Sequence, residues 1–458
     1  MRIRRPCAPL KAIRLPLLLA LAALTARGEI AVPPFAFTDR TLPNGLRVIA
    51  LEDHSAPTAA IQVWYRVGSK DDPAGRSGFA HLFEHMMFKS TKRMPNETLD
   101  RLTEDVGGEN NAFTSDDVTA YHETVPSNHL ERLVWAEAER LASLQVDDAN
   151  FHTERDVVKE EFRQSVLAQP YGEFGEWIPK MSFAAHPYKR PTIGNIEELD
   201  ASNLDEVKNF HATFYRPDNA VLVVAGDFEP ADLQRWVDEY FGPIPKPDAP
   251  IPRVTVKEPP RTGERTLRDS SPKVPLPALA VTYLGPAIVS EEAPALDVLQ
   301  QALSGGESSR LYRVLIYEKE LAQSAEFAAD LRADLGLLTF QMILASGVNI
   351  AKARAALLDE VKKLTAAPIS DAELTTAKNQ LLAQRLSARE TSDGKAAALA
   401  EAAAIRGDPA LVNSDLAKLE AVTAEQVQAA AKKWFTDDNR LVLEYLPATE
   451  AAKGKAKK

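Results

Sequence analysis

The chain has almost no cysteine. Among its 458 residues the only cysteine is Cys7, close to the N-terminus. Because Cys7 falls in a segment that we expect to be removed, the mature chain would contain neither a thiol nor a disulfide. An oxidising compartment would therefore be tolerated, but disulfides would contribute nothing to stability.

Long apolar segments are missing as well. The longest apolar run, residues 15–24, is too short to span a bilayer. It precedes small residues that end at Ala26, and it follows the basic residues Arg2, Arg4, Arg5, Lys11 and Arg14. This pattern predicts a secretory signal peptide over residues 1–26, with a signal anchor as the alternative. We expect no membrane span in the mature chain and a periplasmic or secreted location.

An excess of positive charge is absent too. The formal net charge is −11, and it becomes −16 without residues 1–26, because that segment holds five basic residues and no acidic one. An acidic surface argues against nucleic acid as a partner and for solubility. The short C-terminal tail, 449–458, is basic.

Proline is concentrated between residues 241 and 265, where helices and central strands are disfavoured. We interpret residues 243–268 as an extended linker between two halves, 34–242 and 269–448. Residues 199–227 and 419–447 align without a gap at an offset of 220, and each reads as a helix, a turn and an apolar strand. We therefore predict an α+β fold of two homologous halves, with helices packed on mostly antiparallel sheets.

The stretch SGFAHLFEHMMFKST, residues 77–91, places His81 and His85 four positions apart with Glu84 between them. Its apolar residues recur at helical spacing, so both imidazoles would lie on one helix face and could reach one ion. Zinc suits such ligands, and Glu84 could take a proton from a water molecule. The alternative is a solvated face with coincidental histidines; chance produces this motif on the order of one time in a hundred.

A second acidic segment offers a further ligand. Glu154 and Glu161 are seven positions apart and share a helix face. Val157, Val158 and Phe162 would form the buried stripe of that helix. The alternative is an ordinary acidic helix surface.

Four segments together resemble the pitrilysin and insulinase-type zinc metallopeptidases, in particular the short bacterial processing-peptidase-like members. They are HLFEH, VGGENNAFTSDDVTAYHETVP from Val106, ERDVVKEEFRQ from Glu154 and HPYKRPTIGNIEEL from His186. The resemblance implies that His81 and His85 bind Zn²⁺ and that Glu84 is the general base. It also implies Glu161 as the third metal ligand.

The same resemblance assigns three more residues and leaves one open. Glu154 would support the zinc histidines, and Glu160, about 100° away on the helix, remains a second candidate for the ligand. Asn111 and Ala112 would lie on an edge strand that pairs with an extended peptide. The alternative for these two residues is a polar hairpin edge or turn.

The second half departs from the pattern. Ala377 and Gln384 stand where the first half has its two glutamates, and no histidine follows His211, so we expect no second metal site. The resemblance also implies an arginine and a tyrosine that hold the substrate, but Ile316 and Gln323 stand there. Arg310 or Tyr317 could take their place. Otherwise these donors would come from a homologous non-zinc subunit, and a homodimer is possible.

These observations favour a zinc-dependent metalloendopeptidase that hydrolyses extended peptides or unfolded polypeptides in an enclosed chamber. It would be the catalytic subunit of a heterodimer with a homologous non-zinc subunit. Two alternatives remain: a non-catalytic structural or peptide-binding homologue, and a chaperone-like protein with structural zinc.

Overall fold

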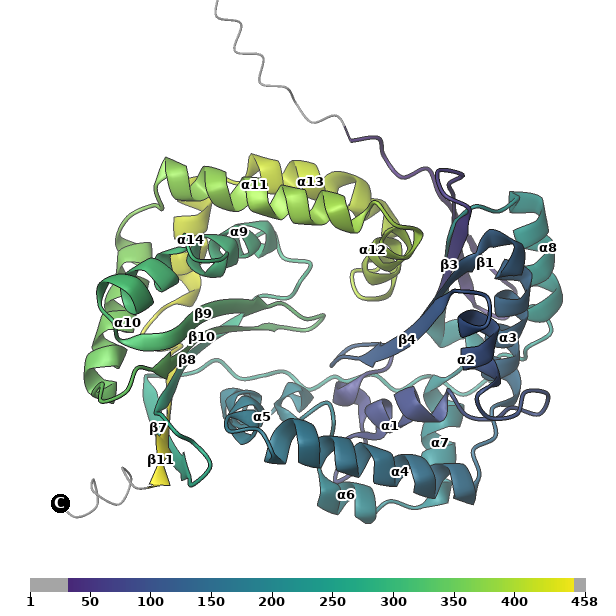
Figure 1. The fold of residues 1–458 in the computed structure, drawn as a ribbon, viewed down its shortest axis with the longest axis horizontal. Helices are drawn as coiled ribbons and strands as arrows, with labels where there is room; N and C mark the ends of the chain where they lie inside the picture. Colours follow the sequence, from purple (N-terminus) through teal and green to yellow (C-terminus); the bar gives the residue numbers. More distant parts are fainter. Residues whose placement is uncertain (1–31, 449–458) are drawn as a thin grey trace, which may run out of the picture. The chain divides into compact units, whose positions relative to one another are not determined.

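A computed structural model describes residues 32–448 of the chain (Figure 1). The predicted signal peptide, 1–26, and the basic tail, 449–458, lie outside the described residues. Residues 35–448 belong to one compact unit. Within residues 32–448, no helix combines the length and the apolar character needed to cross a membrane.

The first half contains a six-stranded sheet with the order β1-β2-β6-β3-β5-β4. Only β2 and β6 run parallel; the other neighbours are antiparallel. The strands are β1 (Thr38–Thr41), β2 (Arg47–Glu52), β3 (Thr58–Tyr65), β4 (Glu109–Thr114), β5 (Thr119–Pro126) and β6 (Ala220–Gly226). The helices of this half are α1 (Phe79–Met86), α2 (Thr98–Glu104), α3 (Leu130–Ser143), α4 (Asp148–Phe162), α5 (Gly172–Ser182), α6 (Ile196–Asp200), α7 (Leu204–Phe214) and α8 (Pro230–Tyr240).

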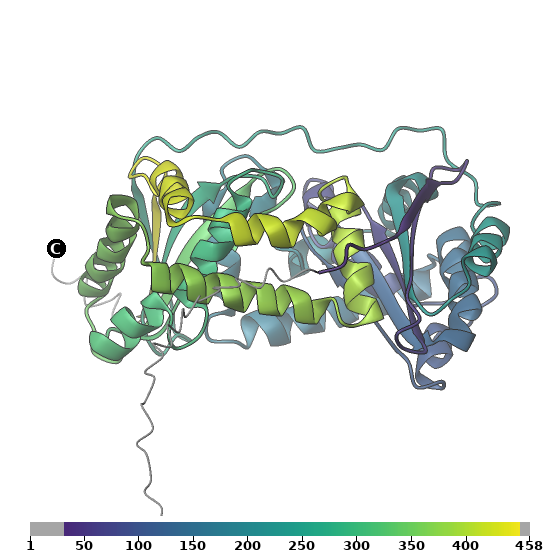
Figure 2. The same cartoon turned by 90° about the horizontal axis from the view of Figure 1, so that it is seen from above.

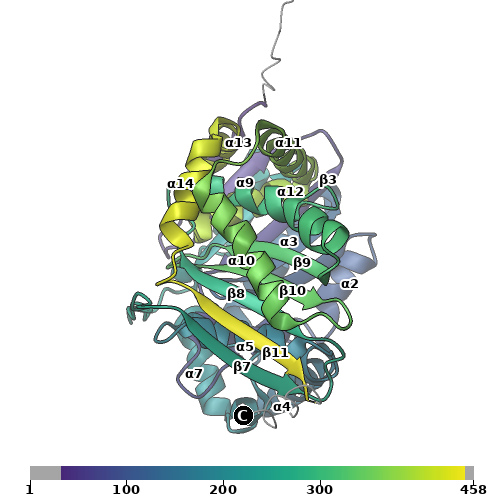
Figure 3. The ribbon, with the colours of Figure 1, turned by 90° about the vertical axis from the view of Figure 1, so that its left-hand side faces the viewer.

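The second half repeats this arrangement. Its sheet has the order β7-β11-β8-β10-β9, again with one parallel pair, β7 and β11 (Figure 3). The strands are β7 (Arg265–Ser271), β8 (Ala278–Gly285), β9 (Ala322–Asp330), β10 (Gly336–Leu344) and β11 (Leu441–Pro447). The helices are α9 (Ala293–Ser304), α10 (Ile350–Ala366), α11 (Asp371–Ala388), α12 (Ser392–Ala404), α13 (Val412–Ala421) and α14 (Ala424–Trp434).

The internal repeat is visible in local structure. Helices α7 and α14 begin exactly 220 positions apart, and each has a capping box, built on Asn203 in one case and Thr423 in the other. Each helix is followed by a buried strand, β6 or β11. The prediction of an α+β fold with two related halves is confirmed.

In each half, one helix packs on the sheet of the other half. Side chains of α5 pack on the second sheet, and side chains of α12 pack on the first. At the first interface lie Phe174, Ile178, Ala278, Ala280, Leu441 and Leu443; at the second lie Ile49, Leu51, Trp64, Val221, Val223 and Leu399. The central strands β3 and β6 are therefore buried on both faces, because α1, α3 and α7 contribute to the core on the other side of the sheet.

No helix or strand lies between α8 and β7, where the chain runs as an extended segment (Figure 2). The strand β7 already starts at Arg265, inside the range predicted as linker. This segment is fixed to both halves. The Glu258 carboxylate accepts hydrogen bonds from the amides of residues 184–186, at 2.6 to 2.9 Å. Arg261 donates to the carbonyls of Ser182 and Thr282.

Candidate metal centre

The helix that carries the histidines has a well-defined start. Gly78 adopts a φ of 97°, and a Cβ there would come within 2.9 Å of the Cα of Gly194, so glycine is needed on both counts. The Asp72 carboxylate accepts hydrogen bonds from the amides of Gly78 and Ala80, at 2.7 and 2.9 Å. It thereby satisfies donors that a helix N-terminus leaves free. The apolar face of α1 is buried through Phe79, Leu82, Phe83 and Met86.

The second helix, α4, begins at an N-cap, Asp147, whose side chain accepts from the amide of Asn150. Its buried face includes Phe151, Glu154 and Val158. The prediction that Val157 belongs to the buried stripe is wrong, since Val157 is 44% exposed while Glu154 is only 4% exposed. A glutamate can take this buried place because a lysine pairs with it, as described below.

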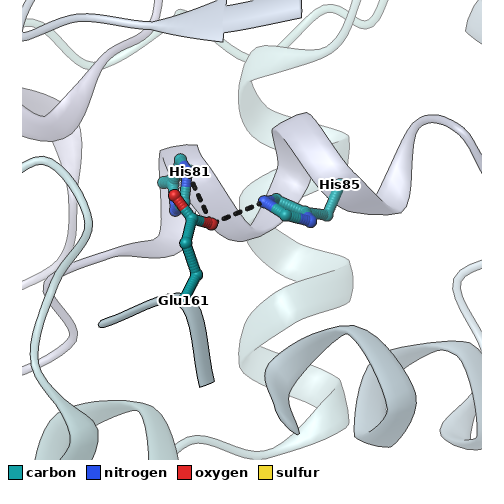
Figure 4. Close-up of side chains that lie close together, drawn as sticks. All are labelled: His81, His85 and Glu161. Carbon is teal, nitrogen blue, oxygen red and sulfur yellow. Dashed lines mark ion pairs between the residues drawn. The ribbon is translucent and has the colours of Figure 1, made fainter. Parts of the chain in front are cut away.

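Helices α1 and α4 contact each other and bring His81, His85 and Glu161 together (Figure 4). Oε2 of Glu161 lies 3.7 Å from Nε2 of His81 and 3.4 Å from Nε2 of His85. Ligands about 2.0–2.1 Å from one tetrahedral ion are separated by roughly 3.3 Å, so the observed spacing fits a shared zinc ion. Two nitrogens and one oxygen would leave a fourth position open. Among the described residues, this is the one cluster of metal-ligating side chains found.

The protonation state of His81 also suits a ligand. Burial and the neighbouring His85 lower the pKa of the His81 imidazole to about 4. The ring is therefore neutral at neutral pH, which is the form that donates a lone pair to a metal.

Glu84 projects from α1 and is tied to the edge of the sheet. Its Oε2 accepts a hydrogen bond from Oγ1 of Thr114, at 2.6 Å. Burial raises the pKa of the Glu84 carboxyl. A carboxylate whose pKa is raised toward the working pH is a better proton acceptor than an exposed one.

Glu154 lies on the other side of His85. Its Oε2 is 3.7 Å from Nδ1 of His85, and its Oε1 is 2.8 Å from Nζ of Lys89. The geometry leaves Nε2 of His85 for the metal side and sets Glu154 against the opposite ring nitrogen. Partners at this nitrogen orient a metal-bound histidine and fix its tautomer.

Lys89→Met is expected to weaken both the fold and the metal site. The change leaves Glu154 buried without its cation, which we expect to cost about 2 kcal/mol of unfolding free energy, less than for a fully buried pair because water reaches Lys89. Zinc affinity should fall by about 10–100-fold. Urea unfolding of the metal-free protein and zinc titration measure the two effects. Lys92→Met, at an exposed neighbour, is the control, and an equal loss there would contradict the assignment.

Asn111 and Ala112 lie in β4, the outermost strand at one edge of the first sheet. One side of β4 pairs with β5 and no strand of the described chain pairs with the other. The carboxamide of Asn111 accepts a hydrogen bond from the amide of Ala112, at 2.8 Å. These residues are therefore in a strand and not in a turn.

The second half holds no comparable site in the described residues. At the equivalent positions Ala377 is buried and Gln384 is an exposed amide. The Arg310 guanidinium is held by the carboxylate of Glu373 through two contacts of 2.7 Å. Tyr317 is 77% exposed.

Sequence reasoning did not single out Asp72, Lys89 or Thr114. Lys89 is four positions after His85, so helical spacing could have indicated it. Asp72 lies in a loop and Thr114 at the end of a strand, and the sequence does not show that either residue lies next to α1.

Comparisons with known proteins follow the same division into halves. Residues 47–195 match the family model described as insulinase (peptidase family M16), and residues 202–381 match the peptidase M16 inactive domain. The zinc protease PqqE of Helicobacter pylori is 32% identical over 370 residues, which are 79% of this chain and 82% of that protein. The probable mitochondrial-processing peptidase subunit beta of Arabidopsis thaliana is 27% identical, covering 87% of this chain and 76% of that protein.

Comparison with solved structures gives the same family resemblance. The crystal structure of a protease from Helicobacter pylori superposes with a TM-score of 0.87 at 27% identity, covering 91% of this chain and 100% of that chain. The family assignment rests on two observations. Two family models together match most of the chain, and a zinc protease relative is more than 30% identical to it. The chain belongs to the M16 peptidase family of insulinase-type proteins.

Proposed function

We propose that the protein is a zinc-dependent metalloendopeptidase that hydrolyses extended peptides or unfolded polypeptides. The observation that carries the proposal is the cluster of His81, His85 and Glu161, together with Glu84 on the helix α1 that carries both histidines. A structural zinc site would normally be closed by four side chains and would give such a carboxylate no task.

His81, His85 and Glu161 would hold the ion. When bound, zinc supplies a Lewis acid that polarises a peptide carbonyl and lowers the pKa of a water molecule. Glu84 would accept the proton of the attacking water on its carboxylate and then pass it to the leaving amine. Glu154 would keep His85 oriented. The free edge of β4, at Asn111 and Ala112, would pair with the peptide backbone by strand addition.

The proposal includes a homologous second subunit. Ile316 and Gln323 can supply neither a cationic guanidinium nor a phenolic hydroxyl, and Arg310 is already engaged by Glu373. A relative named as a subunit, the beta chain of a mitochondrial processing peptidase, supports an assembly of this kind. A homodimer is the alternative arrangement. The leader-like residues 1–26 support export to the periplasm or beyond the cell.

The test is metal content together with turnover of fluorogenic peptides, by the chain alone and with a homologous chain. We expect about one zinc per chain and hydrolysis that stops on chelation. Glu161→Gln should lower zinc occupancy at a fixed free-zinc concentration by at least 10-fold, because it weakens one of three ligands. Full activity of the lone chain would end the two-subunit part of the proposal.

A second function has one specific observation in its favour. The missing arginine and tyrosine would suit a non-catalytic, peptide-binding homologue. In that case the chain would bind zinc and peptide, but no peptide would be cleaved with or without a second subunit.

A further inference from the structure

The hydrogen bond between Thr114 and Glu84 joins two elements that would otherwise be independent. Thr114 is the last residue of β4, and Glu84 is in α1. Along β4 the side chains of Asn110, Ala112 and Thr114 are more covered than those between them. Asn110 donates to Oγ1 of Thr103 in α2, so this face of the strand is bonded to the helices at two points.

The turn after Thr114 is itself held firmly. Asp116 accepts from the hydroxyl of Ser69 at 3.0 Å and pairs with Arg332 at 3.1 Å. Asp117 accepts from the hydroxyl of Tyr188 at 2.6 Å and from the amide of Ala333 at 2.9 Å. Arg332 and Ala333 belong to the β9–β10 turn of the second half. The half without metal ligands therefore fixes the end of the strand that holds Thr114.

A glutamate on a helix has three side-chain torsions, so its carboxylate needs a partner to keep one orientation. The hydroxyl of Thr114 provides a donor to one oxygen and leaves the other for a substrate water. Preorganised groups of this kind act because they need no rearrangement during the reaction.

We propose that Thr114 is a positioning residue that holds the Glu84 carboxylate in one orientation beside the edge strand β4. The second half keeps Thr114 in place through Arg332 and Ala333, which hold the turn after it. The inference rests on the proposed function, in which Glu84 is the base and β4 receives the peptide.

Two variants separate the hydroxyl from the shape of the side chain. Thr114→Val keeps the shape and removes the donor, and Thr114→Ser keeps the donor and removes the methyl group. We expect Thr114→Val to lower kcat by about 10–100-fold, a fraction of what a general base contributes, with KM changed less than about 2-fold. Thr114→Ser should retain kcat within about 3-fold. Zinc content and the melting temperature should stay close to those of the wild type in both.

An unchanged kcat in Thr114→Val, or equal losses in the two variants, would overturn the inference. Crystal structures of the zinc-loaded wild type and Thr114→Val examine the same point without turnover. Glu84 should adopt another rotamer in Thr114→Val, and a carboxylate that stays in place would also overturn it. Absence of hydrolysis by the zinc-loaded wild type would count against the proposed function instead, and the rotamer comparison would still decide the role of Thr114.

Discussion

Glu84→Gln is expected to lower kcat by about 10²–10⁴-fold, the usual contribution of a general base, while the protein keeps its zinc. Glutamine preserves the size of the side chain but cannot accept the proton of the attacking water. Glu84 is not one of the three clustered donors, so metal binding should persist. Steady-state peptide hydrolysis and metal analysis of the same preparation measure both quantities.

Glu160→Gln serves as the matched control for this change. The Glu160 carboxylate is exposed and already interacts with Arg163 and Gln164 on its own helix. We expect hydrolysis and zinc content within about 2-fold of the wild type. If Glu84→Gln retained full turnover with bound zinc, Glu84 would not be the base. If instead Glu160→Gln lost zinc, the ligand assignment on α4 would need revision.

Neither half is expected to fold without the other. A fragment of residues 27–256 lacks α12, so it would expose the face of the first sheet that α12 covers. Ile49, Leu51, Trp64, Val221 and Val223 are fully or almost fully buried on this face. At about 1.5–3 kcal/mol for each large apolar side chain, their exposure would remove about 10 kcal/mol. This matches the whole free energy of unfolding of a typical domain.

Circular dichroism and thermal melting of each separate fragment measure this effect, and co-expression of the two fragments should restore a cooperative transition. The control is the intact chain cleaved only between residues 250 and 251, in the extended segment, which should remain assembled. A cooperative melt by either fragment alone would contradict the expectation.

Much of the local structure follows from short-range patterns. The apolar spacing around His81 and His85 predicts a helix, and the structure has one at Phe79–Met86. The helix predicted to carry Glu154 and Glu161 is present as Asp148–Phe162. A π-helical turn, Arg163–Leu167, directly follows the second of these helices. Apolar spacing indicates such helices because it reflects contacts within a few residues of each other.

The contacts between distant segments could not be derived in the same way. The sequence does not indicate that α5 and α12 pack on each other's sheets, because either helix could satisfy its apolar face on its own half. Likewise, Val157 looks as apolar as Val158, and Glu154 is buried in its place only because Lys89 is nearby. Thr114 could be connected to Glu84 only after β4 was placed beside α1.

The exchange of α5 and α12 also constrains how the two halves can diverge. The second half has Ala377 and Gln384 in place of two glutamates, and neither residue belongs to the cluster that covers one face of the first sheet. The second half cannot lose α12 without uncovering that sheet. A half without a cluster of metal-ligating side chains is thereby kept from deletion, because the half that has the cluster needs α12 to bury one face of its sheet.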